Sequence, residues 1–412
     1  MIGRRPPLDV VLAVACVAGS CAAYTTGAST PVPPAAEPSS RSVAASAQAS
    51  LALPPHVDVV LSAYEGATSI EWTDERGARG TARDATSLRG PVKLGQRTYD
   101  GEIFVERRSE GGLQVVVRAP LEDYVEGVVA AELAIWSARP AELEAQAIAA
   151  RTFAAATIAQ RRRAGLDDRL TDGVLDQAYR GRHVASDTRG GRDAAARLRA
   201  AVRATEGVVL TRGAQLEEAR YHAACGGHTA PFADVFRREV RERGARGPGG
   251  VPCPACAERA RRETEAKAPD PTRPLAWIAE VPAERLEALG RSVDLDGPPV
   301  QLAPVRVDPA GRWLDVALRD ASGTTRTVPF DDFRRAIGYG LWKSGVVAAT
   351  VPRPGAALRG GSLRVQGRGR GHGVGLCQEG MRDLADEGWT SREILAHYYP
   401  GARLETAAIV AP

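Results

Sequence analysis

The feature that most constrains the fold is a change of pattern at Pro120, where strand-like segments give way to helix-like ones. The strand-like segments are rich in Val, Ile, Tyr and Phe, the residues favoured in strands, and they are 57–61, 70–72, 99–107 and 113–117. After Pro120, the segment 142–163 carries apolar residues at a period of about 3.6 residues, which predicts a long helix. A second helix is predicted at 191–205, with short strands at 208–210 and 219–223. This order predicts an α+β fold with a β-rich N-terminal part and central helices.

The composition fits a folded chain and argues against a nucleic-acid-binding protein. With 412 residues and 44% hydrophobic content, the chain can bury the core of one large domain or of a few smaller ones. Its net charge is +4, but charges of both signs are interspersed and no Lys/Arg block is present. We therefore expect no nucleic-acid partner, whereas mild basicity suits a polyanionic cell wall.

The N-terminus has the features of an export signal. Arg4 and Arg5 precede the apolar run Val10–Gly19, which is about half as long as a membrane span. Residues 1–21 are therefore predicted to be a signal peptide, and the protein is expected in the periplasm or cell envelope. Small residues before Cys21 resemble a lipoprotein cleavage box without its usual Leu, so an acylated Cys21 and ordinary cleavage nearby both stay open. This lipid anchor is the only membrane attachment that we expect.

Two further stretches mark the limits of the globular part, which is predicted at 56–408. Residues 22–55 are rich in Ala, Ser, Thr and Pro and have too few large apolar residues to fold alone, so they are predicted to form a disordered tether. Within the globular part, the stretch at about 237–272 is dense in Arg, Glu, Gly and Pro. It is predicted to be a charged surface insertion around Cys253 and Cys256.

Three segments in a fixed order resemble one known family. They are 120–133 (PLEDYVEGVVAAEL) followed by 146–153 (QAIAARTF), then 221–229 (YHAACGGHT), and finally 367–378 (GRGRGHGVGLCQ) followed by 394–401 (ILAHYYPG). Together they resemble the stage II sporulation protein D (SpoIID/LytB) family of peptidoglycan lytic transglycosylases and amidase enhancers. Each segment alone is a weak signal, whereas all three in this order are specific. The resemblance implies a SpoIID-like α+β globule with a Gly-rich C-terminal segment.

The resemblance places the catalytic glutamate at Glu132. Cleaving a glycosidic bond requires a proton on the leaving oxygen, and a carboxyl in a partly dry cleft can hold that proton near neutral pH. Glu132 ends the apolar run Val128–Ala131, where burial would raise its pKa, whereas Glu122 and Glu126 lie in a polar setting. From the residues alone, the alternative is a structural ion pair between Glu132 and Arg151.

The resemblance also implies residues that bind the glycan. They come from all three segments and are Gln146, Arg151, His222, His372 and Gln378. Arg151 is expected to orient the catalytic carboxylate or to bind the sugar. The glycines around His372 let the backbone approach a ligand closely, and the alternative is an exposed His in a tight turn.

The spacing of the cysteines predicts a metal site. Two pairs of residues, each separated by two others, supply the three sulfurs and one imidazole of a closed, structural zinc site: Cys225, His228, Cys253 and Cys256. His222 is an alternative imidazole ligand. Export into an oxidising compartment favours disulfides instead, and Cys377 is then a further partner. Zinc, a disulfide and free thiols all stay open.

These features favour a lytic transglycosylase that cleaves glycan between N-acetylmuramic acid and N-acetylglucosamine and leaves a 1,6-anhydro-muramyl end. In this reaction the muramic acid's own C6 hydroxyl attacks its anomeric carbon, so a second carboxylate is not needed. The alternative implied by the resemblance is a non-catalytic wall-binding protein that stimulates an N-acetylmuramoyl-L-alanine amidase. The expected partners are therefore peptidoglycan glycan strands and, in the alternative, an amidase.

Overall fold

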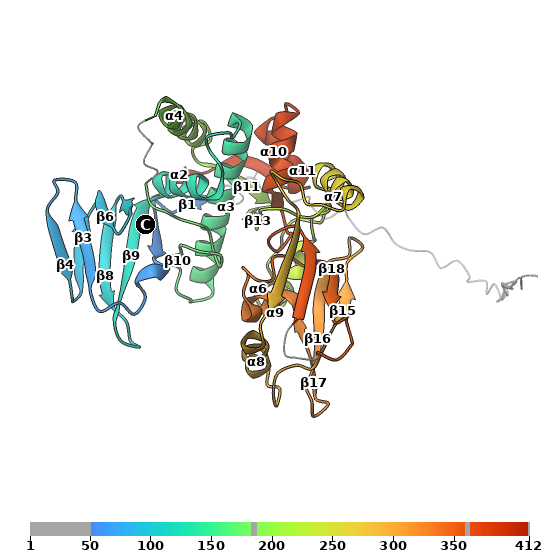
Figure 1. The fold of residues 1–412 in the computed structure, drawn as a ribbon. Coiled ribbons are helices and arrows are strands. Elements are labelled where there is room, and N and C mark those ends of the chain that lie inside the picture. The colour runs from blue at the N-terminus through green and yellow to red at the C-terminus, as the bar shows by residue number, and fades with distance from the viewer. Residues whose placement is uncertain (1–50, 183–187, 359–362, 411–412) are drawn as a thin grey trace, which may run out of the picture. The chain divides into compact units, whose positions relative to one another are not determined.

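The computed structural model describes residues 51–182, 188–358 and 363–410 (Figure 1). The predicted signal peptide, Cys21 and almost all of the predicted tether lie outside these residues. Ordered structure begins ahead of the expected boundary at residue 56, because β1 (Ala52–Leu53) pairs in parallel with β22 (Ala408–Ile409) and Leu53 is buried. The two ends of the described chain therefore lie side by side.

The N-terminal part is β-rich, as predicted. One sheet has the order β10-β2-β9-β8-β5, and its strands are β10 (Leu170–Thr171), β2 (His56–Val60), β9 (Leu113–Pro120), β8 (Glu102–Arg107) and β5 (Thr86–Arg89). A second sheet has the order β4-β3-β6-β7, and its strands are β4 (Arg79–Ala82), β3 (Ile70–Asp74), β6 (Val92–Leu94) and β7 (Arg97–Tyr99). A short 3-10 helix, η1 (Ser62–Tyr64), follows β2. Val57 and Val59 alternate into the core, as the two-residue period of a strand requires.

The predicted strand 99–107 is in fact divided between β7 and β8, and the chain turns at Gly101. This residue has a φ of +87°, and a Cβ there would lie 2.1 Å from the carbonyl oxygen of Arg118. Only glycine fits both the conformation and the space, so the chain passes from one sheet to the other at this point.

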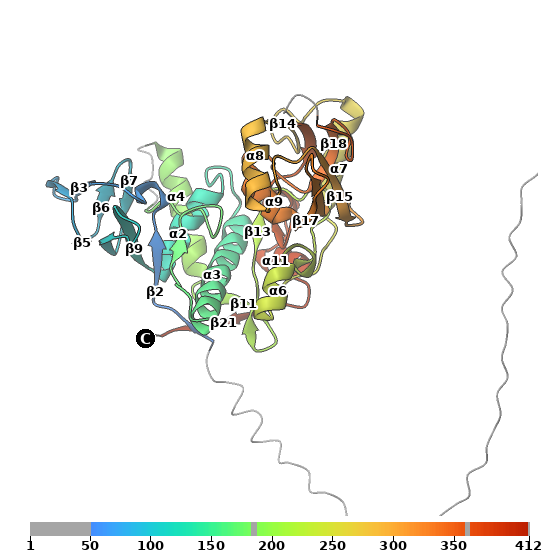
Figure 2. The ribbon, with the colours of Figure 1, turned by 90° about the horizontal axis from the view of Figure 1, so that it is seen from below.

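Three helices follow the sheets: α2 (Leu121–Glu132), α3 (Pro140–Arg163) and α4 (Arg189–Ala204). α3 begins at Pro140, which is suited to the first turn because its missing N–H needs no partner there. The predicted apolar stripe of α3 packs into the N-terminal core, and its other face, including Ala145 and Ala149, packs into a second core. Figures 1 and 2 show α3 between the blue sheets and the later elements. No helix in the described residues is long and apolar enough to cross a membrane.

The C-terminal segment returns to the middle of the chain. β11 (Val208–Arg212) lies between β12 (Gln215–Leu216) and β21 (Arg403–Thr406), and β13 (Tyr221–His222) pairs in parallel with β20 (Leu376–Cys377). α10 (Gln378–Asp386) and α11 (Ser391–Tyr398) follow β20 and pack against α3. The second and third of the recognised segments are thus neighbours in space.

The predicted surface insertion at 237–272 is folded into the molecule. It follows α5 (Phe232–Val235) and contains α6 (Arg237–Arg243) and α7 (Pro254–Ala266), of which α7 packs against α10. Arg259 of α7 is buried, and its guanidinium pairs with Glu379 and Asp383 of α10, each at 2.8 Å. Part of the charge that suggested a surface loop therefore serves to join two helices.

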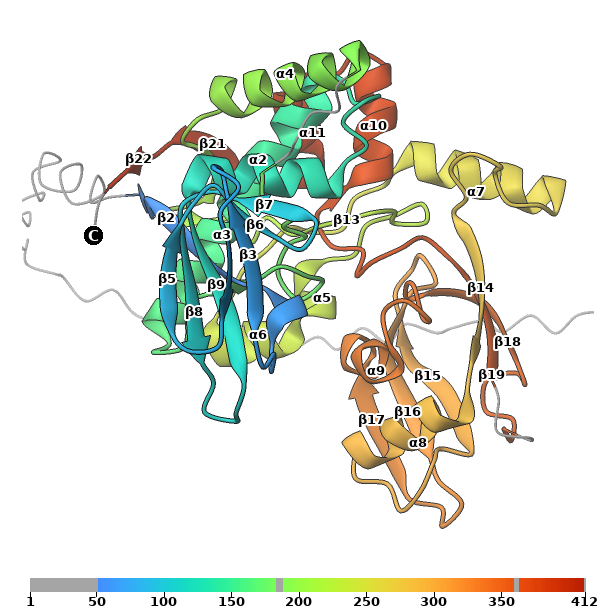
Figure 3. The ribbon, with the colours of Figure 1, turned by 60° about the vertical axis from the view of Figure 1, so that its left-hand side comes forward.

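Residues 276–368 form a unit with its own core. β14 (Ala276–Val281) and β19 (Leu363–Arg368) run antiparallel, so the chain enters and leaves the unit side by side. Between them lie α8 (Ala283–Ser292), β15 (Gln301–Val307), β16 (Trp313–Arg319), β17 (Thr325–Pro329), α9 (Phe330–Ile337) and β18 (Val346–Val351), which Figure 3 shows gathered together. Trp277, Trp313 and Trp342 are buried in its core. The sequence analysis did not separate this unit, because the recognised segments flank it.

Candidate active site

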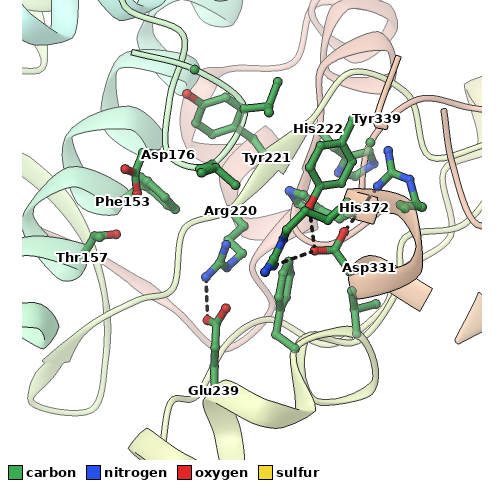
Figure 4. A pocket seen from close by; sticks show the side chains of 18 of the residues that line it. Phe153, Thr157, Asp176, Arg220, Tyr221, His222, Glu239, Asp331, Tyr339 and His372 are labelled. Atoms are coloured by element: carbon green, nitrogen blue, oxygen red, sulfur yellow. Dashed lines mark hydrogen bonds and ion pairs between the residues drawn. The ribbon is translucent and has the colours of Figure 1, made fainter. Parts of the chain in front are cut away.

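A cleft of about 840 Å³ lies where the recognised segments meet. Its walls come from the end of α2, from α3, from the loop 173–180, from β13, from α6 and α9, and from the Gly-rich segment before β20. Figure 4 shows Tyr221, His222 and His372 from these segments facing the same space. The predicted residues Glu132 and Gln378 line it as well.

Glu132 is the last residue of α2 and is held by three neutral donors. Its Oε1 accepts a hydrogen bond from the Ala178 N–H at 2.9 Å and from the Tyr221 hydroxyl at 3.4 Å. Its Oε2 accepts one from Gln378 Nε2 at 3.4 Å. Burial raises the pKa of Glu132, although these hydrogen bonds and the charge of Arg180 act in the opposite direction. The carboxyl therefore keeps its proton to a higher pH than an exposed glutamate would.

Tyr221 is oriented by a chain of side chains behind it. Gln177 Nε2 donates to the Tyr221 oxygen at 2.9 Å, and the Tyr124 hydroxyl donates to Gln177 Oε1 at the same distance. Because the Tyr221 oxygen already accepts from Gln177, its own hydrogen is free to point at Glu132. Burial raises the pKa of Tyr221 well above its ordinary value, so it remains a donor. The sequence analysis gave no role to either residue: no pattern marked 170–180, which contains Gln177, and Tyr124 lies in the first recognised segment without any sign of a partner.

Gln146 supports Gln378 and does not line the cleft. Gln378 Nε2 donates to Gln146 Oε1 at 3.3 Å, and Gln146 is fully buried on α3. A buried amide on a rigid helix limits where the Gln378 side chain can lie. The two predicted glutamines are therefore brought together, but only Gln378 faces Glu132.

The prediction that Arg151 orients Glu132 or binds the sugar is wrong. Arg151 lies away from the cleft and does not contact Glu132. Its guanidinium is fully buried, donates to both carboxylate oxygens of Glu122 at 2.8 and 2.5 Å, and donates to the Val208 carbonyl at 3.0 Å. A guanidinium with these three bonds has no free face for a sugar. Arg151 therefore has a structural role, and Glu122 does not lie in the purely polar setting that was expected.

His222 and His372 come together on one wall of the cleft, with ring centroids 5.5 Å apart. His222 is 4% exposed, whereas His372 is only partly buried. The glycines beside His372 are required sterically, because a Cβ on Gly371 would lie 2.7 Å from His222 Cβ and one on Gly373 would lie 2.4 Å from the Arg312 guanidinium carbon. His372 is thus not a merely exposed residue of a tight turn.

Four buried cysteines meet behind this wall and could hold a metal ion. The sulfurs of Cys225, Cys253, Cys256 and Cys377 all lie within 4.8 Å of one another, and none of the four is in a disulfide. His228 lies outside the cluster, where its Nδ1 contacts the Thr229 carbonyl oxygen at 2.6 Å. His222 also lies outside it. The prediction therefore named three members correctly, whereas the fourth is Cys377 in place of His228, because the pairing of β13 with β20 brings Cys377 to Cys225.

Comparison with known proteins agrees with the motifs. The family model for the stage II sporulation protein (SpoIID) matches residues 109–212, which include Glu132, Gln146 and Arg151. Stage II sporulation protein D of Bacillus subtilis (strain 168) is 26% identical over 302 residues, which is 71% of this chain and 77% of that protein. An amidase enhancer from the same organism is 26% identical over 308 residues, but the alignment covers only 40% of its length. The match and the motifs together show that this chain carries a domain of the SpoIID family.

Proposed function

We propose that this protein is a peptidoglycan lytic transglycosylase in which Glu132 is the general acid and then the general base. The observation that carries the proposal is a difference among the carboxylates of the cleft. Five of them form ion pairs with arginine, and they are Asp176, Glu239, Glu242, Asp331 and Asp332. Glu132 has no ion-pair partner among the described residues and accepts only from neutral donors. It is therefore the cleft carboxyl best suited to exchange a proton.

The chemistry needs only one such group. Protonated Glu132 would donate to the glycosidic oxygen as the bond to the muramic acid's anomeric carbon breaks. The carboxylate would then take the proton of the C6 hydroxyl as that oxygen bonds to the same carbon, which closes the 1,6-anhydro ring. Tyr221 and Gln378 would hold the carboxyl in place through both steps.

The experiment is a product analysis with two substrates. Purified protein is incubated with intact glycan and with glycan stripped of its stem peptides, and the products are examined by mass spectrometry. The proposal expects 1,6-anhydro-muramyl ends that increase with time. Reducing ends without anhydro products would indicate a hydrolase, and the absence of any cleavage would contradict the enzyme.

A second candidate is suggested by the relative named amidase enhancer, which aligns with 68% of this chain. In that case the protein would bind glycan and increase the rate of an N-acetylmuramoyl-L-alanine amidase without cutting the glycan itself. Adding an amidase to the same incubations separates the two functions. Faster release of stem peptides with no anhydro ends would favour the second candidate.

The four cysteines are proposed to hold a structural zinc. Thiolates bound at about 2.3 Å around a tetrahedral zinc lie about 3.8 Å apart, and the Cys256 and Cys377 sulfurs are 3.6 Å apart. Four protein ligands leave no position for water, so the metal would stabilise the fold. Cys377 directly precedes Gln378, the first residue of α10, and Cys225 lies four residues after Tyr221 of β13. The zinc would therefore hold together the two segments that carry these partners of Glu132.

Metal analysis of matched variants tests this site. We expect one zinc per chain in the purified protein, loss of zinc in Cys377→Ser, and full retention in His228→Ala, because His228 lies outside the cluster. A lowered melting temperature should accompany the loss of zinc. A mass lower by two hydrogens under non-reducing conditions would instead show a disulfide and contradict the zinc proposal.

Export and lipid attachment are also proposed, from the N-terminal sequence. Fractionation of cells that express the whole chain should place it in the envelope, and Cys21→Ser should release it from membranes if Cys21 is acylated. Equal membrane association of the two forms would leave only an ordinary signal peptide.

A further inference from the structure

Arg312 is a buried guanidinium whose hydrogen-bond donors are only partly used. It directly precedes β16 in the unit 276–368, and its side chain is 2% exposed. Nη2 donates to the carbonyl oxygens of Cys225 and His228, at 2.9 and 3.1 Å. Nε and Nη1 are buried without a hydrogen-bond partner among the described residues, and Nε lies 3.6 Å from the Asp308 carboxylate. A buried cation of this kind destabilises the fold unless nearby negative charge balances it.

Two glycines make room for this side chain. A Cβ on Gly373 would lie 2.4 Å from the guanidinium carbon of Arg312, and one on Gly345 would lie 2.6 Å from its Cγ. Gly373 belongs to the recognised C-terminal segment, whereas Gly345 belongs to the unit 276–368. The side chain is thus closely packed by both parts of the chain, and its position is fixed.

The cysteine site carries a charge that its surroundings must balance. One Zn²⁺ and four thiolates have an excess of negative charge, and all four cysteines are buried, so water screens this charge poorly. Backbone N–H groups offset part of it. Those of Cys225 and Gly380 donate to Cys377 Sγ at 3.3 and 3.4 Å, and that of Gly227 donates to Cys225 Sγ at 3.3 Å. These groups are dipoles without net charge, so they offset the excess only in part.

Arg312 is a cation that lies beside this site. Its bonds to the Cys225 and His228 carbonyl oxygens hold it against the segment that carries one of the ligands. Burial lowers the pKa of Arg312, whereas the charges of Asp308, Cys225 and Cys377 act in the opposite direction. The guanidinium is therefore close enough to interact with the charge of two of the four sulfurs.

We infer that Arg312 is the counter-cation of the cysteine site, and that its positive charge stabilises the thiolates and strengthens the binding of zinc. The inference rests on the proposed zinc and not on the proposed cleavage of glycan. Arg312 belongs to the unit 276–368, which also contributes α9 to the cleft. The same contact therefore attaches one wall of the cleft to the segment that would hold the metal.

Neutral and charged replacements of Arg312 separate its charge from its hydrogen bonds. Arg312→Gln keeps an amide that can donate to a carbonyl but removes the charge, whereas Arg312→Lys keeps the charge. The full chain is loaded with zinc, and transfer of the zinc to a chromophoric chelator is followed at fixed pH. We expect Arg312→Gln to weaken zinc binding by about 10- to 100-fold, as is typical for groups that surround metal ligands, and Arg312→Lys to retain most of the affinity.

Arg334 supplies a matched control. It is a buried arginine of the same unit and donates to the carbonyl oxygens of Trp342 and Lys343, each at 2.9 Å. Arg334→Gln should lower the melting temperature but leave zinc affinity unchanged, because none of the contacts described for Arg334 is with the cysteines. Thermal unfolding of each variant separates loss of the metal from loss of the fold.

Asp308→Asn tests the charge in the opposite direction, and it does so even where Arg312→Gln fails to fold. Asp308 Oδ1 accepts from the backbone N–H groups of Ala310 and Arg312, at 2.9 and 2.8 Å, and an amide oxygen can do the same. The variant keeps this turn but lacks the carboxylate that competes with the thiolates for Arg312. Zinc should be held more tightly, by about 2- to 10-fold, because one nearby negative charge is removed.

Three results would overturn the inference. They are equal zinc affinity in the wild type and Arg312→Gln, equal losses in Arg312→Gln and Arg312→Lys, and weaker zinc binding by Asp308→Asn. A wild-type chain without zinc would contradict the zinc proposal and this inference together. A chain that binds zinc as expected but forms no anhydro products would contradict only the proposed transglycosylase.

Discussion

Glu122 and Glu132 lie at opposite ends of α2 and meet different partners. Glu122, in the first turn, receives two hydrogen bonds from the buried guanidinium of Arg151. Glu132, in the last turn, faces the cleft and meets only a backbone N–H, a hydroxyl and an amide. Two carboxyls of one helix therefore have different surroundings, because Glu122 pairs with a buried guanidinium whereas Glu132 accepts only from neutral donors.

The largest effect is expected for Glu132→Gln. The amide preserves the shape of the side chain but cannot donate the proton, so formation of anhydro-muramyl ends should fall by about 10²- to 10⁴-fold or more. Product analysis by mass spectrometry measures the loss, and an unchanged melting temperature shows that the fold is intact. Undiminished product formation would remove Glu132 from the mechanism.

Glu122→Ala should instead damage the fold. It leaves the fully buried guanidinium of Arg151 without its carboxylate, which costs about 3–5 kcal/mol of unfolding free energy in comparable pairs. Chemical denaturation measures the loss, and the double variant Glu122→Leu with Arg151→Met should recover part of it. A Glu122→Ala protein that is stable but forms no product would contradict the structural role of Glu122, because that residue would then take part in catalysis.

Tyr221→Phe tests the hydrogen bond that the Tyr221 hydroxyl donates to Glu132. The Tyr221 hydrogen bond lowers the pKa of Glu132, so its removal should raise that pKa further. A general acid is active while protonated, and the rate is lost as the pH rises through its pKa, so the loss should move to higher pH in the variant. At low pH the rate should fall by about fivefold, as expected for one lost hydrogen bond. A pH profile identical to that of the wild type would contradict the contact.

Glu126→Gln is the matched control on the same helix and should have the smallest effect. Glu126 does not line the cleft, so product formation should be unchanged. Burial raises the pKa of Glu126, and a raised pKa means that stability is lost as the pH increases through it. A glutamine does not titrate, so the variant does not lose this stability. The free energy of unfolding of the variant, relative to that of the wild type, should therefore increase slightly as the pH is raised. Loss of activity would show that the wrong carboxyl was chosen.

The sequence by itself determined the local features of this protein. The strand-rich start, the long helix α3 and the position of Glu132 at the end of an apolar run were predicted, because residue propensity and apolar period act over a few neighbouring residues. Residues of all three motif segments line the same cleft. Cys253 and Cys256 were predicted to lie in one cluster, and they do. Their spacing within the first turn of a helix keeps the two sulfurs close together.

Only the tertiary structure decided which distant residues meet. Gln378 contacts Glu132 across 246 residues, and Cys377 joins Cys225 across 152, both through a return of the chain that no local period records. The tertiary structure also pairs Arg151 with Glu122, whereas the sequence analysis considered an ion pair between Arg151 and Glu132. Helical spacing alone cannot choose between these two glutamates, because the partner of Arg151 depends on how α3 packs against α2.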